Sequence, residues 1–242
     1  MSGAALQVVL FDLDDTLFAH REAVRSGIVA HSALRGHRGE ADALDRLWFE
    51  LEERHYHSYL AGDLSFEGQR RARARDFAAA HGVELDGDAS GAWFADYFKH
   101  YRAAWHLHAD ALPTLDALET AIPGVRFGII TNGEADFQAD KIDRVALASR
   151  LEHVIASGAL GVTKPDARIF QHAVEAFGVA PAAAVYVGDR LRTDALGAAR
   201  AGLTGVWINR SGKRPSESDA AEIAELGVIE IVSLSELPAL LA

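Results

Sequence analysis

The sequence predicts an α/β fold in which a doubly wound parallel, Rossmann-like sheet carries an inserted α-helical bundle. From residue 112 onward, short apolar runs alternate with helical stretches, the pattern of parallel strands with helices on both faces of the sheet. Between residues 18 and 108, by contrast, apolar residues recur at helical spacing. The apolar run Val8–Phe11 precedes this helical region. We therefore expect it to form the first strand, with the helical region inserted directly after it.

Four helices are expected in the insertion. Apolar residues at helical spacing in 23–34 and 44–59 predict the first two. Gly62-Asp63-Leu64-Ser65 then interrupts the pattern, and Ser65 is a suitable N-cap for a third helix that ends near Gly82. The fourth helix begins near Ser90 and carries an aromatic stripe to Trp105, which we interpret as packing between helices of a small bundle.

The remaining strands of the sheet are expected where short apolar runs stand between helical stretches. These runs are residues 127–131, 154–156, 184–187, 205–208 and 229–232. The predicted organisation is an α/β core domain, residues 1–17 and 109–242, and a helical cap domain, residues 18–108.

Composition and charge narrow the classes of function. The chain has 242 residues and a formal net charge of −11, which argues against generic binding to nucleic acid or to an anionic membrane surface. It has no cysteine, so a metal site could use only oxygen and histidine nitrogen. No segment reaches the ~18 apolar residues that span a bilayer, and the N-terminus has no signal-like pattern. We expect a cytoplasmic protein, as a monomer or a homodimer.

Polar side chains gather where the predicted strands end. Asp12 and Asp14 follow the first strand, Thr131-Asn132-Gly133 ends the second, and Gly188-Asp189 ends the strand at 184–187. Lys164 precedes a helix in the same part of the fold. Ligands of open α/β sheets bind outside the carboxyl ends of the strands. Because neighbouring carboxylates repel one another, this rim needs a cation, a shared proton or a hydrogen-bond network.

Four ordered motifs on this rim resemble those of the haloacid dehalogenase superfamily. They are Phe11-Asp12-Leu13-Asp14-Asp15-Thr16-Leu17, Ile130-Thr131-Asn132-Gly133, Lys164-Pro165-Asp166, and Gly188-Asp189 with Asp194 five residues on. The helical insertion after the first motif resembles the cap carried by one large branch of the superfamily. The resemblance covers nearly the whole chain.

The resemblance implies roles for five residues that bind or react with the substrate. Asp12 is the expected nucleophile and Asp14 the expected general acid/base. Thr131 and the backbone of Asn132 are expected to bind the phosphate, and Lys164 to offset its negative charge. A phosphate ester would repel a bare carboxylate, so attack on it requires cations at the site.

The resemblance also implies a Mg²⁺ cofactor. The expected ligands are Asp12, Asp14 and Asp189, which suit the preference of Mg²⁺ for hard oxygen atoms. Asp194 could either bind the metal directly or support its ligands. The founding dehalogenases lack the second aspartate of the first motif, whereas this chain keeps Asp14, so the match is to the phosphatase branch.

The expected function is a magnesium-dependent phosphatase that hydrolyses a small phosphorylated metabolite through an aspartyl-phosphate. A sugar phosphate or a nucleotide monophosphate is the expected substrate, and residues 18–21 and 62–65 of the cap are candidates for specificity. A phosphotransferase or phosphomutase and a dehalogenase-type hydrolase remain as alternative enzymes. A non-catalytic sensor of a phosphorylated ligand is the alternative from another class. We interpret the basic residues of the cap as a solvated helix face: Arg70, Arg71, Arg73 and Arg75.

Overall fold

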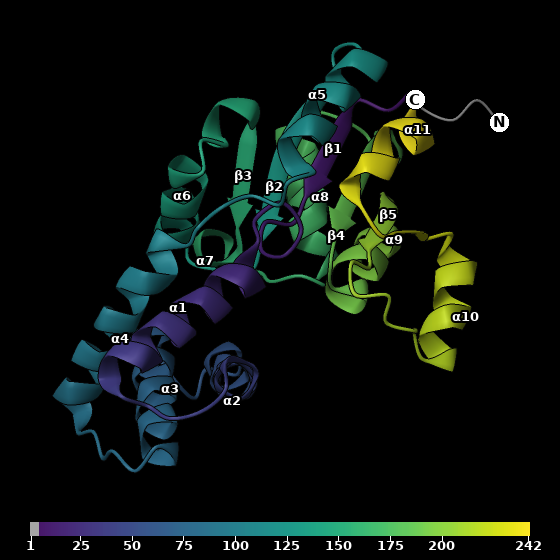
Figure 1. The fold of residues 1–242 in the computed structure, drawn as a ribbon. Helices are drawn as coiled ribbons and strands as arrows, with labels where there is room; N and C mark the ends of the chain where they lie inside the picture. The colour runs from purple at the N-terminus through teal and green to yellow at the C-terminus, as the bar shows by residue number, and fades with distance from the viewer. Residues whose placement is uncertain (1–4) are drawn as a thin grey trace. The chain divides into compact units, whose positions relative to one another are not determined.

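The computed structural model describes residues 5–242 and divides into two compact units (Figure 1). One unit consists of the chain up to Ala19 together with His106–Ala242, and the other is His20–Trp105. None of the helices in the described part of the chain is both long and apolar enough to cross a membrane.

The first unit is built on a parallel sheet of six strands in the order β3-β2-β1-β4-β5-β6. The chain order reverses between β1 and β4, which is the position where open sheets of this class bind ligands. The predicted α/β fold class is therefore confirmed. The strands are β1 (Val8–Phe11), β2 (Arg126–Thr131), β3 (His153–Ala156), β4 (Ala184–Gly188), β5 (Thr204–Ile208) and β6 (Ile229–Ile231).

Helices cover both faces of this sheet. α5 and α11 pack against each other in front of the sheet in Figure 1, whereas α8 lies behind it and contacts α9. The apolar side of α8 buries Ile169, Phe170 and Ala173 against the sheet, as expected for an amphipathic helix. The helices are α5 (Ala111–Ala121), α6 (Ala135–Arg144), α7 (Ser157–Leu160), α8 (Ala167–Ala176), α9 (Leu196–Arg200), α10 (Glu217–Leu226) and α11 (Leu237–Leu241).

The second unit is a bundle of four helices, α1 (His20–Arg35), α2 (Ala41–Leu60), α3 (Phe66–Ala80) and α4 (Gly87–Ala103). Ser65 caps α3 as predicted, since its hydroxyl accepts a hydrogen bond of 2.9 Å from the Gly68 N–H. The aromatic stripe of α4 is buried, and Trp48 of α2 packs against Tyr97 at 4.5 Å between ring centroids. The stripe therefore packs between helices, as predicted.

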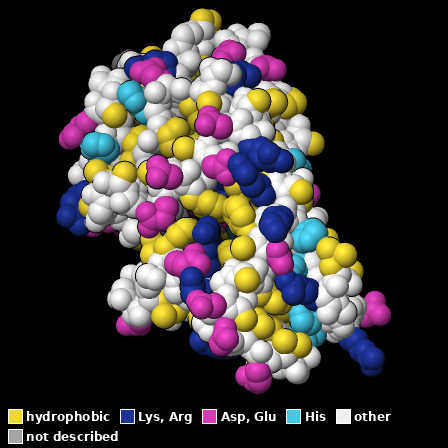
Figure 2. Space-filling model, turned by 90° about the vertical axis from the view of Figure 1, so that its left-hand side faces the viewer, with side chains coloured by type: hydrophobic (Ala, Val, Ile, Leu, Met, Phe, Trp, Pro, Cys, Tyr) yellow, Lys and Arg dark blue, Asp and Glu magenta, His cyan; other side chains and the backbone are white. Residues whose placement is uncertain are grey.

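The interpretation of the basic residues on α3 as a solvated face is wrong for two of the four. Arg73 is 6% exposed, forms an ion pair with Glu52 and stacks on Trp48, and the Arg70 guanidinium lies 4.1 Å over the Phe66 ring. The helical period explains the difference, because residues 70 and 73 share the inner face of α3, whereas Arg71 and Arg75 lie outside. Elsewhere, basic and acidic side chains are interspersed on the face shown in Figure 2.

Candidate active site

Three carboxylates meet at the carboxyl ends of β1 and β4. Asp12 directly follows β1, where its N–H donates to the Val187 carbonyl at 2.8 Å, and Asp189 directly follows β4. Asp194 lies in the π-helical turn that leads into α9. One oxygen from each of Asp12, Asp189 and Asp194 lies within 4.8 Å of the others. The predicted convergence of acids at this rim is therefore present in the structure.

A lysine lies among these acids. Lys164 is 5% exposed, and its ammonium donates to Asp12 Oδ1 at 2.6 Å, to Asp194 Oδ1 at 2.7 Å and to the Tyr186 hydroxyl at 2.7 Å. These three contacts match the three N–H donors of a lysine ammonium. Asn132 holds the backbone of Lys164, since its Oδ1 accepts from the Lys164 N–H at 2.8 Å and its Nδ2 donates to the Lys164 carbonyl at 3.0 Å.

Tyr186 is a site residue that the sequence reasoning missed. Its hydroxyl donates to the Ile130 carbonyl at 2.9 Å and accepts from Lys164, so it helps to orient the Lys164 ammonium. Burial raises the pKa of Tyr186 well above its ordinary value, which keeps the phenol neutral. A signal was present, because a hydroxyl within the apolar run Ala184–Gly188 must find a buried partner.

Lys164 alone does not balance the negative charge of the acidic group, which consists of Asp12, Asp189 and Asp194. Burial, together with the charges of Asp194 and Asp14, raises the pKa of Asp12 to about 7 even though Lys164 opposes the shift. Burial and the neighbouring acids also raise the pKa of Asp189 well above its ordinary value. A cation bound between such carboxylates stabilises their ionised form. A donor set made only of oxygen atoms fits Mg²⁺.

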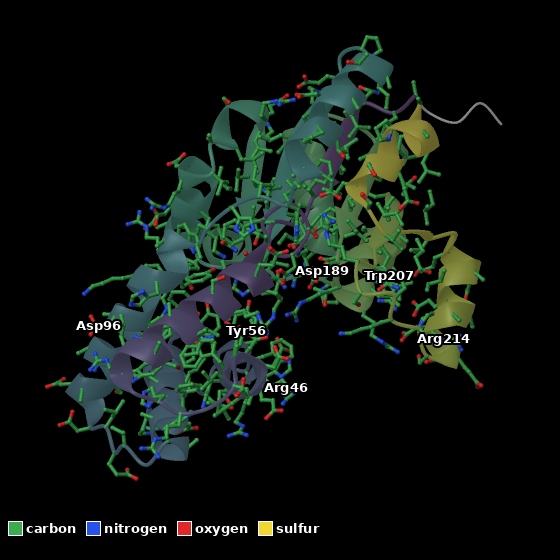
Figure 3. The ribbon with its side chains drawn as sticks, viewed as in Figure 1. Arg46, Tyr56, Asp96, Asp189, Trp207 and Arg214 are labelled. Carbon is green, nitrogen blue, oxygen red and sulfur yellow. The ribbon has the colours of Figure 1, made fainter. Side chains whose placement is uncertain are left out.

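Backbone geometry fixes the loops that carry these acids. A Cβ atom at Gly188 would lie 2.4 Å from the Asp194 Cβ, so only glycine allows this approach. Trp207 of β5 donates its indole N–H to the Asp189 carbonyl at 2.9 Å, and both residues are labelled in Figure 3. Asp15 adopts φ = 63°, in the left-handed region that aspartate tolerates better than most residues, and so turns the chain after Asp14.

Asp14, one of the magnesium ligands expected from the sequence, lies outside the group formed by Asp12, Asp189 and Asp194. Its carboxylate oxygens accept hydrogen bonds from Lys141 Nζ at 2.7 and 2.9 Å and from Gln138 Nε2 at 3.2 Å, and its side chain is 29% exposed. Gln138 Nε2 also donates to Thr131 Oγ1 at 2.7 Å. Lys141 and Gln138 of α6 are thus part of the site, although no sequence motif pointed to them.

Residues 6–202 match the haloacid dehalogenase-like hydrolase family. N-acylneuraminate-9-phosphatase from Rattus norvegicus is 29% identical over 249 residues, which cover 100% of this chain and 96% of that protein. Phosphoserine phosphatase from Thermus thermophilus is 37% identical over 142 residues, but these cover only 59% of this chain and 56% of that protein.

A solved structure shares the fold over its full length. The haloacid dehalogenase-type hydrolase YfnB from Bacillus subtilis, bound to magnesium, matches with a TM-score of 0.78 at 19% identity. The match covers 98% of this chain and 99% of that one.

Proposed function

Because the chain belongs to the haloacid dehalogenase-like hydrolase family and is a phosphatase of phosphoric monoesters, we propose that it hydrolyses a small phosphorylated metabolite through an aspartyl-phosphate and requires magnesium. The observation that carries the proposal is the buried Asp12 carboxylate, held 2.6 Å from Lys164 beside Asp189 and Asp194. A sugar phosphate or a nucleotide monophosphate is the proposed substrate. The likeness to N-acylneuraminate-9-phosphatase supports the first of these.

In the proposed first step, an Asp12 oxygen attacks phosphorus while the bond from phosphorus to the ester oxygen breaks. The Thr131 hydroxyl and the Asn132 backbone hold phosphate oxygens, and Lys164 offsets their charge. Asp12 and Asp189, with Asp194 beside them, would hold magnesium, which would supply further positive charge at the phosphate. The products of this step are the alcohol, once the leaving alkoxide is protonated, and the acyl phosphate of Asp12.

Asp14 moves the protons in both steps. In its protonated form Asp14 donates a proton to the leaving alkoxide. The resulting carboxylate then accepts a proton from the water that attacks the phosphorus of the aspartyl-phosphate, which restores the acid. Inorganic phosphate leaves, and the Asp12 carboxylate is restored. The contacts of Asp14 with Lys141 and Gln138, rather than with the acidic group, support a role distinct from that of Asp12.

The experiment that tests this proposal traps the intermediate. Asp12→Asn should abolish phosphate release, because an amide cannot form the acyl phosphate. Asp14→Asn should still form it from p-nitrophenyl phosphate, whose leaving group needs little acid help, and then accumulate phosphoenzyme. Mass spectrometry of the quenched variant should find the phosphate on the peptide that contains Asp12. Phosphate on another residue, or wild-type turnover by either variant, would overturn the mechanism.

The wild-type protein separates the alternative functions. When the wild-type protein is assayed with magnesium against a panel of phosphorylated metabolites, it should release inorganic phosphate from at least one of them. A sensor would be stabilised by such a ligand without releasing phosphate. A phosphotransferase would transfer the phosphoryl group to a second hydroxyl. A dehalogenase would instead release halide from a 2-haloacid.

A further inference from the structure

The inner face of α6 carries two polar side chains that point into the site. Gln138 and Lys141 are three residues apart, so they lie on the same side of the helix. They are 2% and 1% exposed, in a position where helices normally place apolar residues. Both contact Asp14. We refer to Gln138 and Lys141 as the α6 clamp.

Lys141 holds both oxygens of the Asp14 carboxylate. Its ammonium lies 2.7 Å from Oδ1 and 2.9 Å from Oδ2. The rings of Phe18 and Phe137 flank it, at 5.2 and 4.8 Å from Nζ to the ring centroids. Burying a lysine this deeply is costly unless its charge is paired, so the contact with Asp14 stabilises this arrangement. With both oxygens held, the plane of the carboxylate is fixed.

Gln138 connects Asp14 to the phosphate-binding threonine. Its Nε2 donates to Asp14 Oδ2 at 3.2 Å and to Thr131 Oγ1 at 2.7 Å, which uses both amide hydrogens. The reverse orientation of the amide would place its oxygen against the carboxylate, so electrostatics favour this one. Because the Thr131 oxygen accepts, its own hydrogen is left to donate in another direction, toward a phosphate oxygen.

The close approach of Gln138 also explains the glycine of the second motif. A Cβ atom at Gly133 would lie 2.9 Å from Gln138 Nε2 and 3.3 Å from its Cδ. A larger residue at position 133 would therefore displace the amide from between Asp14 and Thr131.

We infer that Gln138 and Lys141 are positioning residues. They hold the ionised Asp14 carboxylate in place to accept a proton from the attacking water and, through Gln138, direct the Thr131 hydroxyl toward the phosphate. The inference rests on the proposed phosphatase function. It adds that helix α6, through Gln138 and Lys141, positions the groups that react with and bind the substrate. Small misplacements of a reacting group cost large factors in rate, so loss of the clamp should be visible in kinetics.

The first experiment compares Lys141→Met with Arg144→Met, a matched control that removes an exposed cation from the same helix. With an alkyl phosphate, both steps need Asp14, so Lys141→Met should lower kcat by about 10²-fold. With p-nitrophenyl phosphate, the burst of p-nitrophenolate should keep its amplitude, and only the following steady state should slow. Arg144→Met should keep wild-type burst and steady-state rates with both substrates.

The second experiment measures the coupling of each clamp residue to its partner. Adding Lys141→Met to Asp14→Asn should lower kcat by about threefold or less, since the group it positions is already gone. Gln138→Leu should raise KM and the inhibition constant of inorganic phosphate with little dependence on the leaving group, because Thr131 loses its orientation. These readouts separate positioning from a general loss of structure, which would lower burst and steady state together.

The outcomes distinguish this inference from the proposed function. A wild-type protein that releases no phosphate from any ester overturns both. If the wild type is active, the inference alone fails when Lys141→Met keeps wild-type kcat with the alkyl phosphate. It also fails when the losses of Lys141→Met and Asp14→Asn multiply in the double variant.

Discussion

Replacing Lys164 by methionine removes the ammonium from the acidic group while nearly preserving side-chain volume. Lys164 is 5% exposed and lies 2.6 Å from Asp12 and 2.7 Å from Asp194. Breaking a buried ion pair by deleting one partner costs about 3–5 kcal/mol, because the other charge stays buried. Asp12, with its pKa at about 7, can take up a proton near neutral pH and relieve part of this cost. We therefore expect a loss of about 3 kcal/mol in the free energy of unfolding.

The assay is urea unfolding in excess chelator at pH 7, with Lys213→Met as the matched control. Lys213 is an exposed lysine of the same unit, and its replacement should change stability by less than about 0.5 kcal/mol. Lys164→Met should also lower the Tm by about 6–12 °C, given about 2–4 °C per kcal/mol for a domain of this size. Excess magnesium should restore part of the loss, because it binds the folded acids and not the unfolded chain.

Turnover supplies the second readout for this variant. Removing one preorganised cation beside the phosphate should lower kcat by about 10²-fold or more. If Lys164→Met is as stable in chelator as Lys213→Met, the contacts of Lys164 with the acids do not hold the site together. If its kcat is also near that of wild type, the metal alone carries the charge. Either result would refute the reasoning.

Two further predictions concern metal and pH. Chelation should abolish turnover and calcium should inhibit it, because the calcium shell is larger and more flexible. Asp189→Ala should weaken magnesium binding in calorimetry without unfolding the protein, and full activity in excess chelator would contradict this. Burial lowers the pKa of His31 in the helical bundle from 6.5 to about 4. Between these two pH values the unfolded chain therefore binds a proton at His31 that the folded chain does not bind. Stability should fall on acidification from pH 6.5 to 4 by at most about 3 kcal/mol, and urea unfolding of His31→Asn should show a weaker pH dependence.

The sheet and most of its rim could be predicted because two independent patterns agree. Apolar runs place the strands, as Val8–Phe11 does for β1, and polar residues directly after those runs mark their carboxyl ends. Topology then brings ends that are distant in sequence to one place. Asp12 and Asp189 are 177 positions apart in the chain and still meet, because β1 pairs with β4 in parallel.

The residues that escaped prediction are polar side chains on faces that the pattern assigns to the core. Arg73 of α3, Tyr186 of β4 and Lys141 of α6 each point inward. The periodicity of apolar residues identifies the inner face of a helix or strand, but it does not show which polar groups a buried polar side chain contacts there. Those contacts are set by tertiary packing, for example by how α6 places Lys141 against the loop after β1.

Two buried lysines give the carboxylates of Asp12 and Asp14, two residues apart, different surroundings. Lys164 contacts Asp12 together with a second acid and a phenol, which holds Asp12 within the group suited to a metal. Lys141 instead contacts Asp14, whose carboxylate is not part of that group. A compact ammonium with three donors suits both positions better than the planar fork of an arginine. The proposed nucleophile, Asp12, and the proposed acid/base, Asp14, are therefore distinguished by the lysine that each one contacts.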